Sequence, residues 1–253
     1  MKAFLRKEWM EMTRTGRLLI LAVIFLLFGI MNPALAKLTP WIMDMMKESM
    51  AESGLNVGNV TVNAITSWTQ FYKNAPMVLL AFALMCCGVL VNEYQRGTLI
   101  QVVTKGLSRR KIYASKMITV FGSWTVLFFV YSGVTYGYTA YFWGEDKVEN
   151  LIAGIIMYWL FGMFICAFML MFSAMTDSGG QVLLGTGLVL FAVFILNYIP
   201  KLQKFLPFRL MDGLQLSTGA MQMSDFTGAV VTVCICIAVC GIIGTVMFDR
   251  KML

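Results

Sequence analysis

The sequence contains no histidine among its 253 residues, and charged residues make up only 13% of it. Without an imidazole, a histidine-ligated metal site and a histidine general base are both excluded. The charged fraction lies below the roughly 25% usual in soluble domains, while the hydrophobic fraction of 59% exceeds the usual ~45–50%. An ordinary water-soluble globular protein is therefore excluded, and the composition indicates an integral membrane protein.

The sequence also lacks the motifs of several enzyme and disulfide-rich classes. It has no Gly-rich loop ending in Gly-Lys-Ser or Gly-Lys-Thr, so we expect no ATP hydrolysis by this chain. We also expect no bound cofactor and, without histidine, no metal site. All six cysteines fall inside apolar runs, where a disulfide framework of the secreted kind has no role. We interpret them as small packing residues.

Six apolar runs contain no charged side chain and approach the length needed to cross a hydrocarbon core of about 30 Å. They cover residues 18–35, 76–91, 118–142, 151–175, 182–200 and 230–248. The sequence therefore predicts an all-α fold, with one six-helix membrane domain over residues 1–253. The second run is the shortest, but aromatic residues precede it, and a helix that begins earlier could let Lys73 reach the interface.

Lysine and arginine are unevenly shared between the loops on the two sides of these predicted spans. Of the 20 such residues, most precede the first span, follow the last or lie between the second and third. By the positive-inside rule, this distribution predicts a multi-pass protein of the cell membrane with both termini in the cytoplasm. The same cations favour anionic lipid headgroups as partners, and we expect no nucleic-acid partner.

No apolar run carries an Asp, Glu, Lys, Arg or His side chain, which bears on the energy source of any transport. Carriers driven by protons or sodium tend to hold ionisable groups near the membrane midplane. Ion coupling is therefore disfavoured, and so is a membrane-embedded enzyme, because the runs offer only Ser, Thr, Asn and Tyr as polar groups. If the protein transports, another polypeptide is the expected energy source.

Two segments outside the spans are predicted to be amphipathic helices. Residues 1–17 place Phe4, Leu5, Trp9 and Met12 near one helical face, as in a helix lying on the membrane surface. This segment is either a basic topology signal or an elbow helix that also contacts a cytoplasmic partner. In the long loop 37–73, Pro40 predicts the start of a separate helix along the opposite interface.

The connection from Asn92 to Met117 has more features than a basic topology signal needs. It predicts a short apolar helix around Leu99–Val103, a turn at Gly106 and a second helix capped by Ser108 that continues into the third span. Its six cations could act only as a topology anchor. A topology anchor does not require the acidic residue at the end of the second span, Glu93, or the Gly-Thr break that follows it.

The order of motifs in this connection resembles the membrane subunit of type-2 ABC exporters. The resemblance is carried by Glu93, then Gly97-Thr98-Leu99, then Ser108-Arg109, then Lys116, and it extends to Lys7-Glu8-Trp9 and Phe248-Asp249-Arg250 at the two ends. In that family the connection forms the coupling segment, and short re-entrant helices lie between the fifth and sixth spans.

The resemblance implies an exporter permease that pairs with a second copy or a sister permease and with cytoplasmic ABC ATPase subunits. The partner ATPase would bind ATP and Mg²⁺. The resemblance further implies that ATPase coupling involves the residues Glu93, Gly97, Thr98, Arg109, Arg110 and Lys116. In this interpretation Glu93 pairs with a cation, Gly97 permits the turn, and the basic residues meet acidic groups or lipid phosphates.

Two spans carry aromatic or thioether stripes at helical spacing, which either pack between helices or line an adaptable cavity. The candidate cavity residues are Tyr131, Tyr138, Met157, Phe161 and Phe164. Methionine repacks easily and tyrosine offers a hydroxyl, so such a cavity would suit a hydrophobic or amphipathic substrate such as a drug, an antimicrobial peptide or a lipid. The alternative function is a membrane receptor or immunity-type scaffold that binds a ligand without translocating it.

Overall fold

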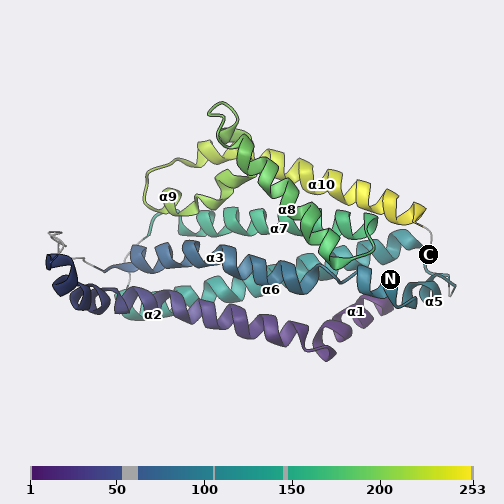
Figure 1. Cartoon of the computed structure of the whole chain (residues 1–253), viewed down its shortest axis with the longest axis horizontal. Helices are drawn as coiled ribbons and strands as arrows, with labels where there is room; N and C mark the ends of the chain where they lie inside the picture. Colours follow the sequence, from purple (N-terminus) through teal and green to yellow (C-terminus); the bar gives the residue numbers. More distant parts are fainter. Residues whose placement is uncertain (1, 53–61, 105, 145–147, 252–253) are drawn as a thin grey trace.

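The computed structural model describes residues 2–52, 62–104, 106–144 and 148–251, and all regular structure in these ranges is helical (Figure 1). The long helices are α2 (Arg17–Glu52), α3 (Ala64–Cys86), α6 (Arg109–Trp143), α7 (Leu151–Met175), α8 (Gly179–Leu196) and α10 (Thr227–Arg250). The shorter elements are α1 (Lys2–Arg14), α4 (Val91–Gln95), α5 (Thr98–Thr104), α9 (Gly213–Ser217) and the 3₁₀ helices η1 (Gln203–Phe205), η2 (Pro207–Met211) and η3 (Met223–Phe226).

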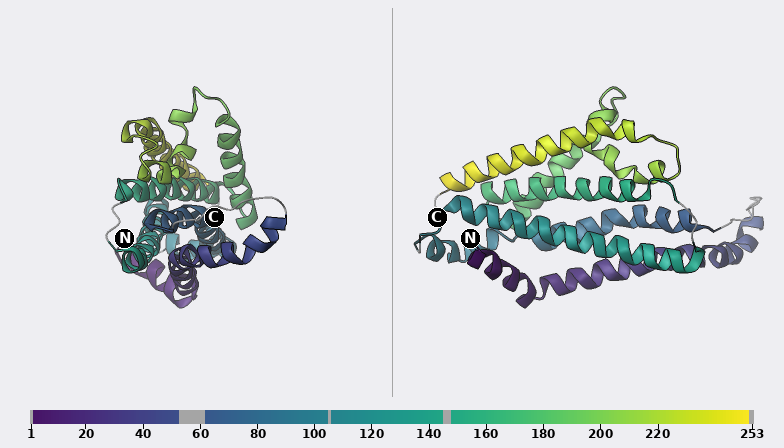
Figure 2. Two further views of the ribbon diagram at one scale, coloured as in Figure 1. Left: turned by 90° about the vertical axis from the view of Figure 1, so that its left-hand side faces the viewer. Right: turned by 180° about the vertical axis from the view of Figure 1, so that it is seen from behind.

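The long helices form an elongated bundle whose elements run roughly along its longest axis (Figure 1). Helices α2, α3 and α6 pack on one another, and α7 packs against α10 on the other side. Helix α8 crosses the bundle obliquely and contacts chiefly α7. Figure 1 and the right-hand view of Figure 2 show that both chain termini lie at the same end of the bundle, next to α1.

Six helical segments in the described ranges are long and apolar enough to cross a membrane. They are Arg17–Ile42, Ala64–Gln95, Arg109–Trp143, Leu151–Met175, Gly179–Leu196 and Met223–Arg250. A helix that is apolar on all sides is stable where lipid or other helices surround it, because its backbone groups bond internally. The structure thus confirms the all-α fold with six long apolar helices.

The segments flanking the first and second spans differ from the sequence-based expectation. Helix α2 continues through Pro33 and Pro40 to Glu52. The prediction of a separate helix that begins at Pro40 is therefore wrong. Helix α3 begins at Ala64, well before Pro76, as the aromatic residues ahead of the second apolar run allowed. Proline usually interrupts a helix because it lacks an N–H group and crowds the preceding turn. Here other groups compensate for one of these prolines.

A buried polar network around Asn32 compensates for Pro33. Since Pro33 has no N–H group, the carbonyl of Gly29 lacks its usual helical donor. The Thr135 Oγ1 atom of α6 lies 3.1 Å from this carbonyl oxygen and 3.1 Å from the Tyr131 carbonyl of its own helix, so its one proton is shared between the two acceptors. The Asn32 amide in turn donates to the Tyr131 hydroxyl at 3.0 Å and to Thr135 Oγ1 at 3.1 Å. The network joins α2 to α6 at the position where α2 would otherwise be weakened.

The same network extends to α3. The Asn74 amide donates to Asn32 Oδ1 at 2.8 Å, and the Tyr131 hydroxyl donates to the Phe71 carbonyl at 3.0 Å. The rings of Phe71 and Tyr131 are stacked with centroids 4.5 Å apart. Three helices are therefore held in one register by hydrogen bonds whose donors and acceptors have no water to compete with them.

We expect Thr135→Val to lower the free energy of unfolding by about 1 kcal/mol, the scale of hydrogen bonds between membrane helices. The substitution keeps the shape of the side chain and removes the donor to the Gly29 carbonyl. For a chain of this size the thermal midpoint should fall by about 2–4 °C. Thr245→Val is the matched control, because the Thr245 hydroxyl donates to the Gly241 carbonyl within its own helix. Equal midpoints for the two variants would contradict a bracing role for Thr135.

Candidate functional site

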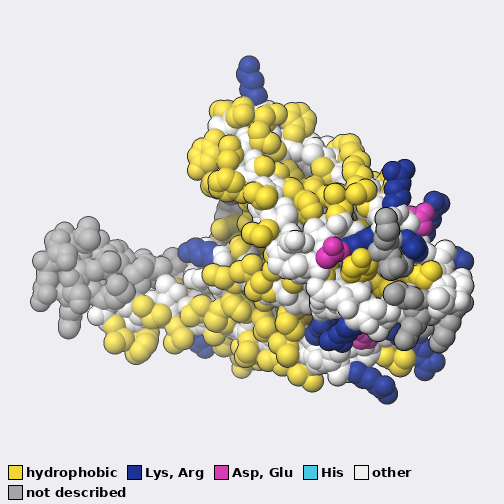
Figure 3. Space-filling view, turned by 45° about the vertical axis from the view of Figure 1, so that its right-hand side comes forward, with side chains coloured by type: hydrophobic (Ala, Val, Ile, Leu, Met, Phe, Trp, Pro, Cys, Tyr) yellow, Lys and Arg dark blue, Asp and Glu magenta, His cyan; other side chains and the backbone are white. Residues whose placement is uncertain are grey.

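The end of the bundle that carries both termini also carries most of the interhelical charge contacts. We define the charged end as α1, the segment 91–104 with α4 and α5, the first turns of α6, the α7–α8 connection and the end of α10. Figure 3 shows Lys, Arg, Asp and Glu side chains gathered on this end, while apolar side chains cover the flanks. This is the division between polar and apolar surface expected of a membrane protein.

Two glycines in a left-handed backbone conformation shape the charged end. Gly16, with φ +70°, separates α1 from α2, and Gly97, with φ +65°, separates α4 from α5. Residues with a Cβ atom rarely adopt this conformation. The two turns allow α1 and α5 to leave the direction of the long helices that they adjoin.

Five charged side chains from three segments form what we call the buried ion cluster: Lys7, Glu8, Glu11, Glu93 and Lys116. Lys116, on α6, pairs with Glu8 of α1, and its Nζ lies 3.1 Å from Glu93 Oε2 on α4. Lys7 pairs with Glu93, with Glu8 at 3.3 Å and with Glu11 at 3.1 Å. The cluster therefore ties α1, α4 and α6 together.

The central members of this cluster are shielded from solvent. The side chain of Lys116 is 1% exposed and that of Glu8 is 2% exposed. Removing a charge from water costs several kcal/mol, which is tolerated when partners of opposite charge and good geometry are present. Lys116 has two carboxylate partners, so the arrangement keeps a buried ammonium compensated on both sides.

The pKa values of the α1 residues follow from this environment. Burial raises the pKa of Glu8 above 4.5, and the positive charge of Lys116 only partly opposes it. Burial alone would lower the pKa of Lys7, but its hydrogen bond to Glu93 and the charges of Glu8 and Glu93 outweigh it and raise that pKa. For Glu11, burial is likewise outweighed by Lys7, which lowers the pKa of this carboxyl.

Three carboxylates of the cluster, those of Glu8, Glu11 and Glu93, come within 4.8 Å of one another, which is close enough to hold a metal ion. The Lys7 ammonium group contacts all three of them. A lysine thus supplies the positive charge that a metal would otherwise provide. The geometry suits an internal ion network joining helices better than a metal centre.

A second set of contacts fixes the end of α10 to the charged end. The guanidinium of Arg110 lies 3.0 Å from Asp249 Oδ2, and Arg109 donates to the Asp249 carbonyl at 3.1 Å. Lys251 Nζ lies 2.7 Å from Asp177 Oδ1 in the α7–α8 connection and 4.3 Å from the centre of the Tyr94 ring. These contacts join the beginning of α6, the end of α10 and the α7–α8 connection.

The structure separates the predicted coupling residues into buried and surface groups. Glu93 and Lys116 are buried and contact each other, whereas Thr98 and Arg110 are exposed. Thr98 donates to the Glu93 carbonyl at 3.1 Å across the Gly97 turn. The short helix expected around Leu99–Val103 is present as α5, and α6 begins directly after Ser108.

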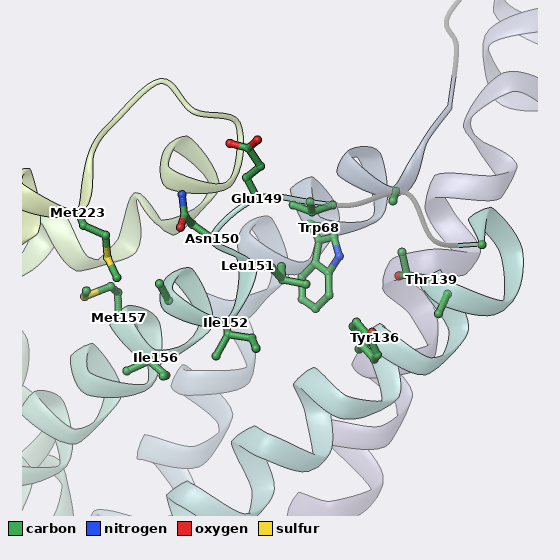
Figure 4. Close-up of a pocket in the computed structure, with 15 residues that line it drawn as sticks. Trp68, Tyr136, Thr139, Glu149, Asn150, Leu151, Ile152, Ile156, Met157 and Met223 are labelled. Carbon is green, nitrogen blue, oxygen red and sulfur yellow. The ribbon is translucent and has the colours of Figure 1, made fainter.

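The predicted cavity residues do not gather in one place. Tyr131, Phe161 and Phe164 are buried between helices, and the Tyr131 hydroxyl belongs to the Asn32 network. Tyr138 is 42% exposed. Met157 lines an open cavity at the far end of the bundle, between α3, α6 and α7 (Figure 4).

The sequence does not predict the partners of the coupling residues. Lys7-Glu8 and Phe248-Asp249 belong to the resemblance, but their spacing indicates no pairing. One signal is the position of Glu93 and Lys116 next to the ends of apolar runs, where an unpaired charge is costly. This position predicts that both residues have partners of opposite charge, but the sequence alone does not indicate that α1 provides them.

The chain resembles known proteins over its whole length. A family model described as "ABC-2 family transporter protein" matches residues 3–253. The chain is also 24% identical over 260 residues to a Bacillus subtilis (strain 168) protein described as the uncharacterized transmembrane protein YxlG. That alignment covers 99% of this chain and 97% of its relative.

We expect Lys116→Met to destabilise the protein by about 3–5 kcal/mol, because Glu8 and Glu93 lose a shared partner while buried. Lys111→Met is the matched control on the same helix, where the side chain is exposed, and it should change stability by less than about 0.5 kcal/mol. Thermal unfolding of the detergent-solubilised variants measures the difference. A Lys116 variant as stable as the Lys111 variant would show that the ion cluster does not hold these helices.

A pH series tests the raised pKa of Glu8. Because the folded protein binds this proton more tightly than the unfolded chain, stability contributed by protonated Glu8 is lost as the pH rises from 4.5 through the raised pKa. Glu8→Gln mimics the protonated form. We therefore expect its unfolding free energy, relative to the native protein, to increase over that pH range. A constant difference between the two proteins across the series would contradict the assigned shift.

Proposed function

The chain belongs to the ABC-2 family of transporter proteins and is a membrane permease, and we propose that it is the membrane-spanning subunit of an ATP-driven exporter. Permeases of this family lack catalytic ATPase activity, so a separate cytoplasmic ABC ATPase would bind ATP and Mg²⁺. The observation that carries the proposal is the buried ion cluster. It connects the coupling segment proposed below to two other helices.

In this proposal the charged end faces the cytoplasm. It contains α1, the segment 91–104, the first turns of α6 and the end of α10 with Lys251, which together hold most of the lysine and arginine residues of the chain. Cytoplasmic loops of membrane proteins carry an excess of these residues. Both termini would then be cytoplasmic, and α1 would act as an elbow helix at the inner membrane surface, with Trp9 and Met10 exposed toward the lipid interface.

The segment 91–104 is the proposed coupling segment, with α5 as the coupling helix. Gly97 and Thr98 form the turn at its surface, and the exposed Arg96 and Arg110 flank it. Arg109 would act indirectly, since its guanidinium holds the backbone at the end of α10. These surface groups would meet the partner ATPase, whose acidic side chains would complement them.

Glu93 and Lys116 would transmit the motion of the coupling segment. Displacing α5 displaces Glu93, and Glu93 is paired with Lys7 on α1 and Lys116 on α6. Because breaking either pair leaves a buried charge, the three segments are expected to move as one body. ATP-driven closure of the ATPases would then rock the bundle between inward-open and outward-open states, a rigid-body change of the kind seen in other transporters.

A second permease, identical or a sister subunit, would complete the transporter. Helices α2, α8 and α10 expose much apolar surface, including Leu184, Leu188 and Phe191 on α8. Membrane lipid and the second permease would share this surface. A hydrophobic or amphipathic substrate, such as a drug, an antimicrobial peptide or a lipid, would pass between the two permeases, with Tyr138 and Met157 as the accessible residues among the predicted cavity set.

The partner assignment predicts that an ABC ATPase co-purifies with the native protein from its host membrane. Arg96→Glu combined with Arg110→Glu should reduce the recovered ATPase by about tenfold or more, because like charges placed across an interface cost several kcal/mol. Quantitative mass spectrometry of the detergent-solubilised complex measures the ratio of ATPase to permease.

The control for this experiment is Lys201→Glu combined with Lys204→Glu, which reverses two exposed cations outside the charged end. This variant carries the same change in net charge and should retain the ATPase. Undiminished ATPase recovery with the Arg96 and Arg110 variant would argue against the docking surface. A preparation without any ATPase, under conditions that preserve other ABC complexes, would overturn the exporter assignment itself.

A further inference from the structure

A large cavity lies at the end of the bundle opposite the charged end. We call it the far-end cavity; it has a volume of about 1190 Å³ and is bounded by the beginnings of α3 and α7 and the end of α6. Figure 4 shows Trp68 between Leu151 and Ile152 on one side and Tyr136 and Thr139 on the other. Ligand pockets in proteins usually measure about 300–1,000 Å³, so this cavity has room for a drug-sized molecule.

The walls of the far-end cavity are mainly apolar and aromatic. Trp68 and Tyr136 contribute rings, and Ile152, Ile156 and Met157 contribute flexible aliphatic or thioether surface. The hydroxyl of Thr139 is already engaged with that of Ser67, at an Oγ–Oγ1 distance of 2.7 Å. Tyr136 is 59% exposed, whereas Trp68 is 1% exposed and packs against Phe71. A ligand between these walls would therefore be held by apolar contact and by the ring of Tyr136.

The charged side chain among the described lining residues lies at the rim of the cavity. Among the described residues that line it, Glu149 is the single charged one, and it is exposed next to Asn150. Figure 4 shows both side chains at the edge of the cavity, above Leu151 and away from Trp68. A negative group at the mouth of a mainly apolar pocket favours a ligand whose positive charge lies at that mouth.

We propose that the far-end cavity binds an amphipathic monocation, with its apolar body between Tyr136 on α6 and Ile152 and Ile156 on α7, and its positive group at the rim beside Glu149. The proposal rests on the exporter function above and names the charge class of its substrate. With the charged end in the cytoplasm, as proposed above, the cavity opens at the outer face of the membrane. The ligand's charged group would lie at the water interface while its apolar part remains between the helices.

The test compares two probes of nearly the same shape and opposite charge, tetraphenylphosphonium and tetraphenylborate. Both are added to the purified chain in a neutral detergent, and binding is measured by equilibrium dialysis. The native protein should prefer the cation. Glu149→Gln should weaken tetraphenylphosphonium binding by about threefold, the scale of one exposed charge contact, and should strengthen tetraphenylborate binding. Glu149→Lys should enlarge both changes.

Two further variants separate the charge of Glu149 from other effects. Asp225→Asn removes an acidic group from the neighbouring η3 that does not line the cavity, and it should leave both affinities unchanged. Ile156→Trp fills the space between the walls and should weaken both probes alike. Equal binding of the two probes to the native protein, or affinities that do not respond to Glu149 substitution, would overturn the proposal.

This experiment is independent of the partner ATPase. It uses the purified permease, so loss of cation selectivity would reject the ligand class and leave the exporter assignment standing. Conversely, cation-selective binding by a protein with which no ATPase co-purifies would support the proposed ligand site and argue against the transport role.

Discussion

The buried ammonium group of Lys116 is the constraint on which the charged end depends. A lysine this deeply buried is stable only where carboxylates meet it, and they come from α1 and α4, which are separate in sequence. Once Glu8 and Glu93 are in place, α1 must cross the beginning of α6, and the segment leading to α5 must lie beside both. The position of the proposed coupling helix is thus a consequence of satisfying one charge.

The middle of the bundle satisfies its polar groups in a different way. There the requirement comes from the backbone, because Pro33 leaves the Gly29 carbonyl without a helical donor in a region where water does not compete. Neutral hydroxyl and amide groups from α3 and α6 meet the need, with Asn32 at the centre. Hydrogen bonds between neutral groups hold helices together at a lower desolvation cost than ion pairs, which suits the depth at which they occur.

The sequence predicts the features that depend on local composition. Apolar runs without charge indicate the six long helices, and Gly97 and Gly106 indicate breaks around α5, since these signals lie within one segment. It does not predict that α2 continues past Pro40, because within one segment a proline indicates the start or the interruption of a helix. Nor does the sequence predict the partners of Glu93 and Lys116. Helix α1 lies far from both residues in sequence, and neither periodicity nor spacing indicates which charges pair.

The two ends of the molecule therefore differ in how firmly their helices are joined. At the charged end, ion pairs link α1, α4, α6, α10 and the α7–α8 connection, so in the proposed exporter a displacement of the coupling segment would reach several helices at once. At the far end, α6 and α7 line a cavity with mainly apolar walls, and the hydrogen bonds between these two helices lie farther along them, at Trp124, Thr125 and Trp159. A bundle that is braced at one end and open at the other converts a small displacement at the braced end into a change of cavity shape. In the proposed exporter, the energy input and the ligand site would therefore lie at opposite ends of the same helices.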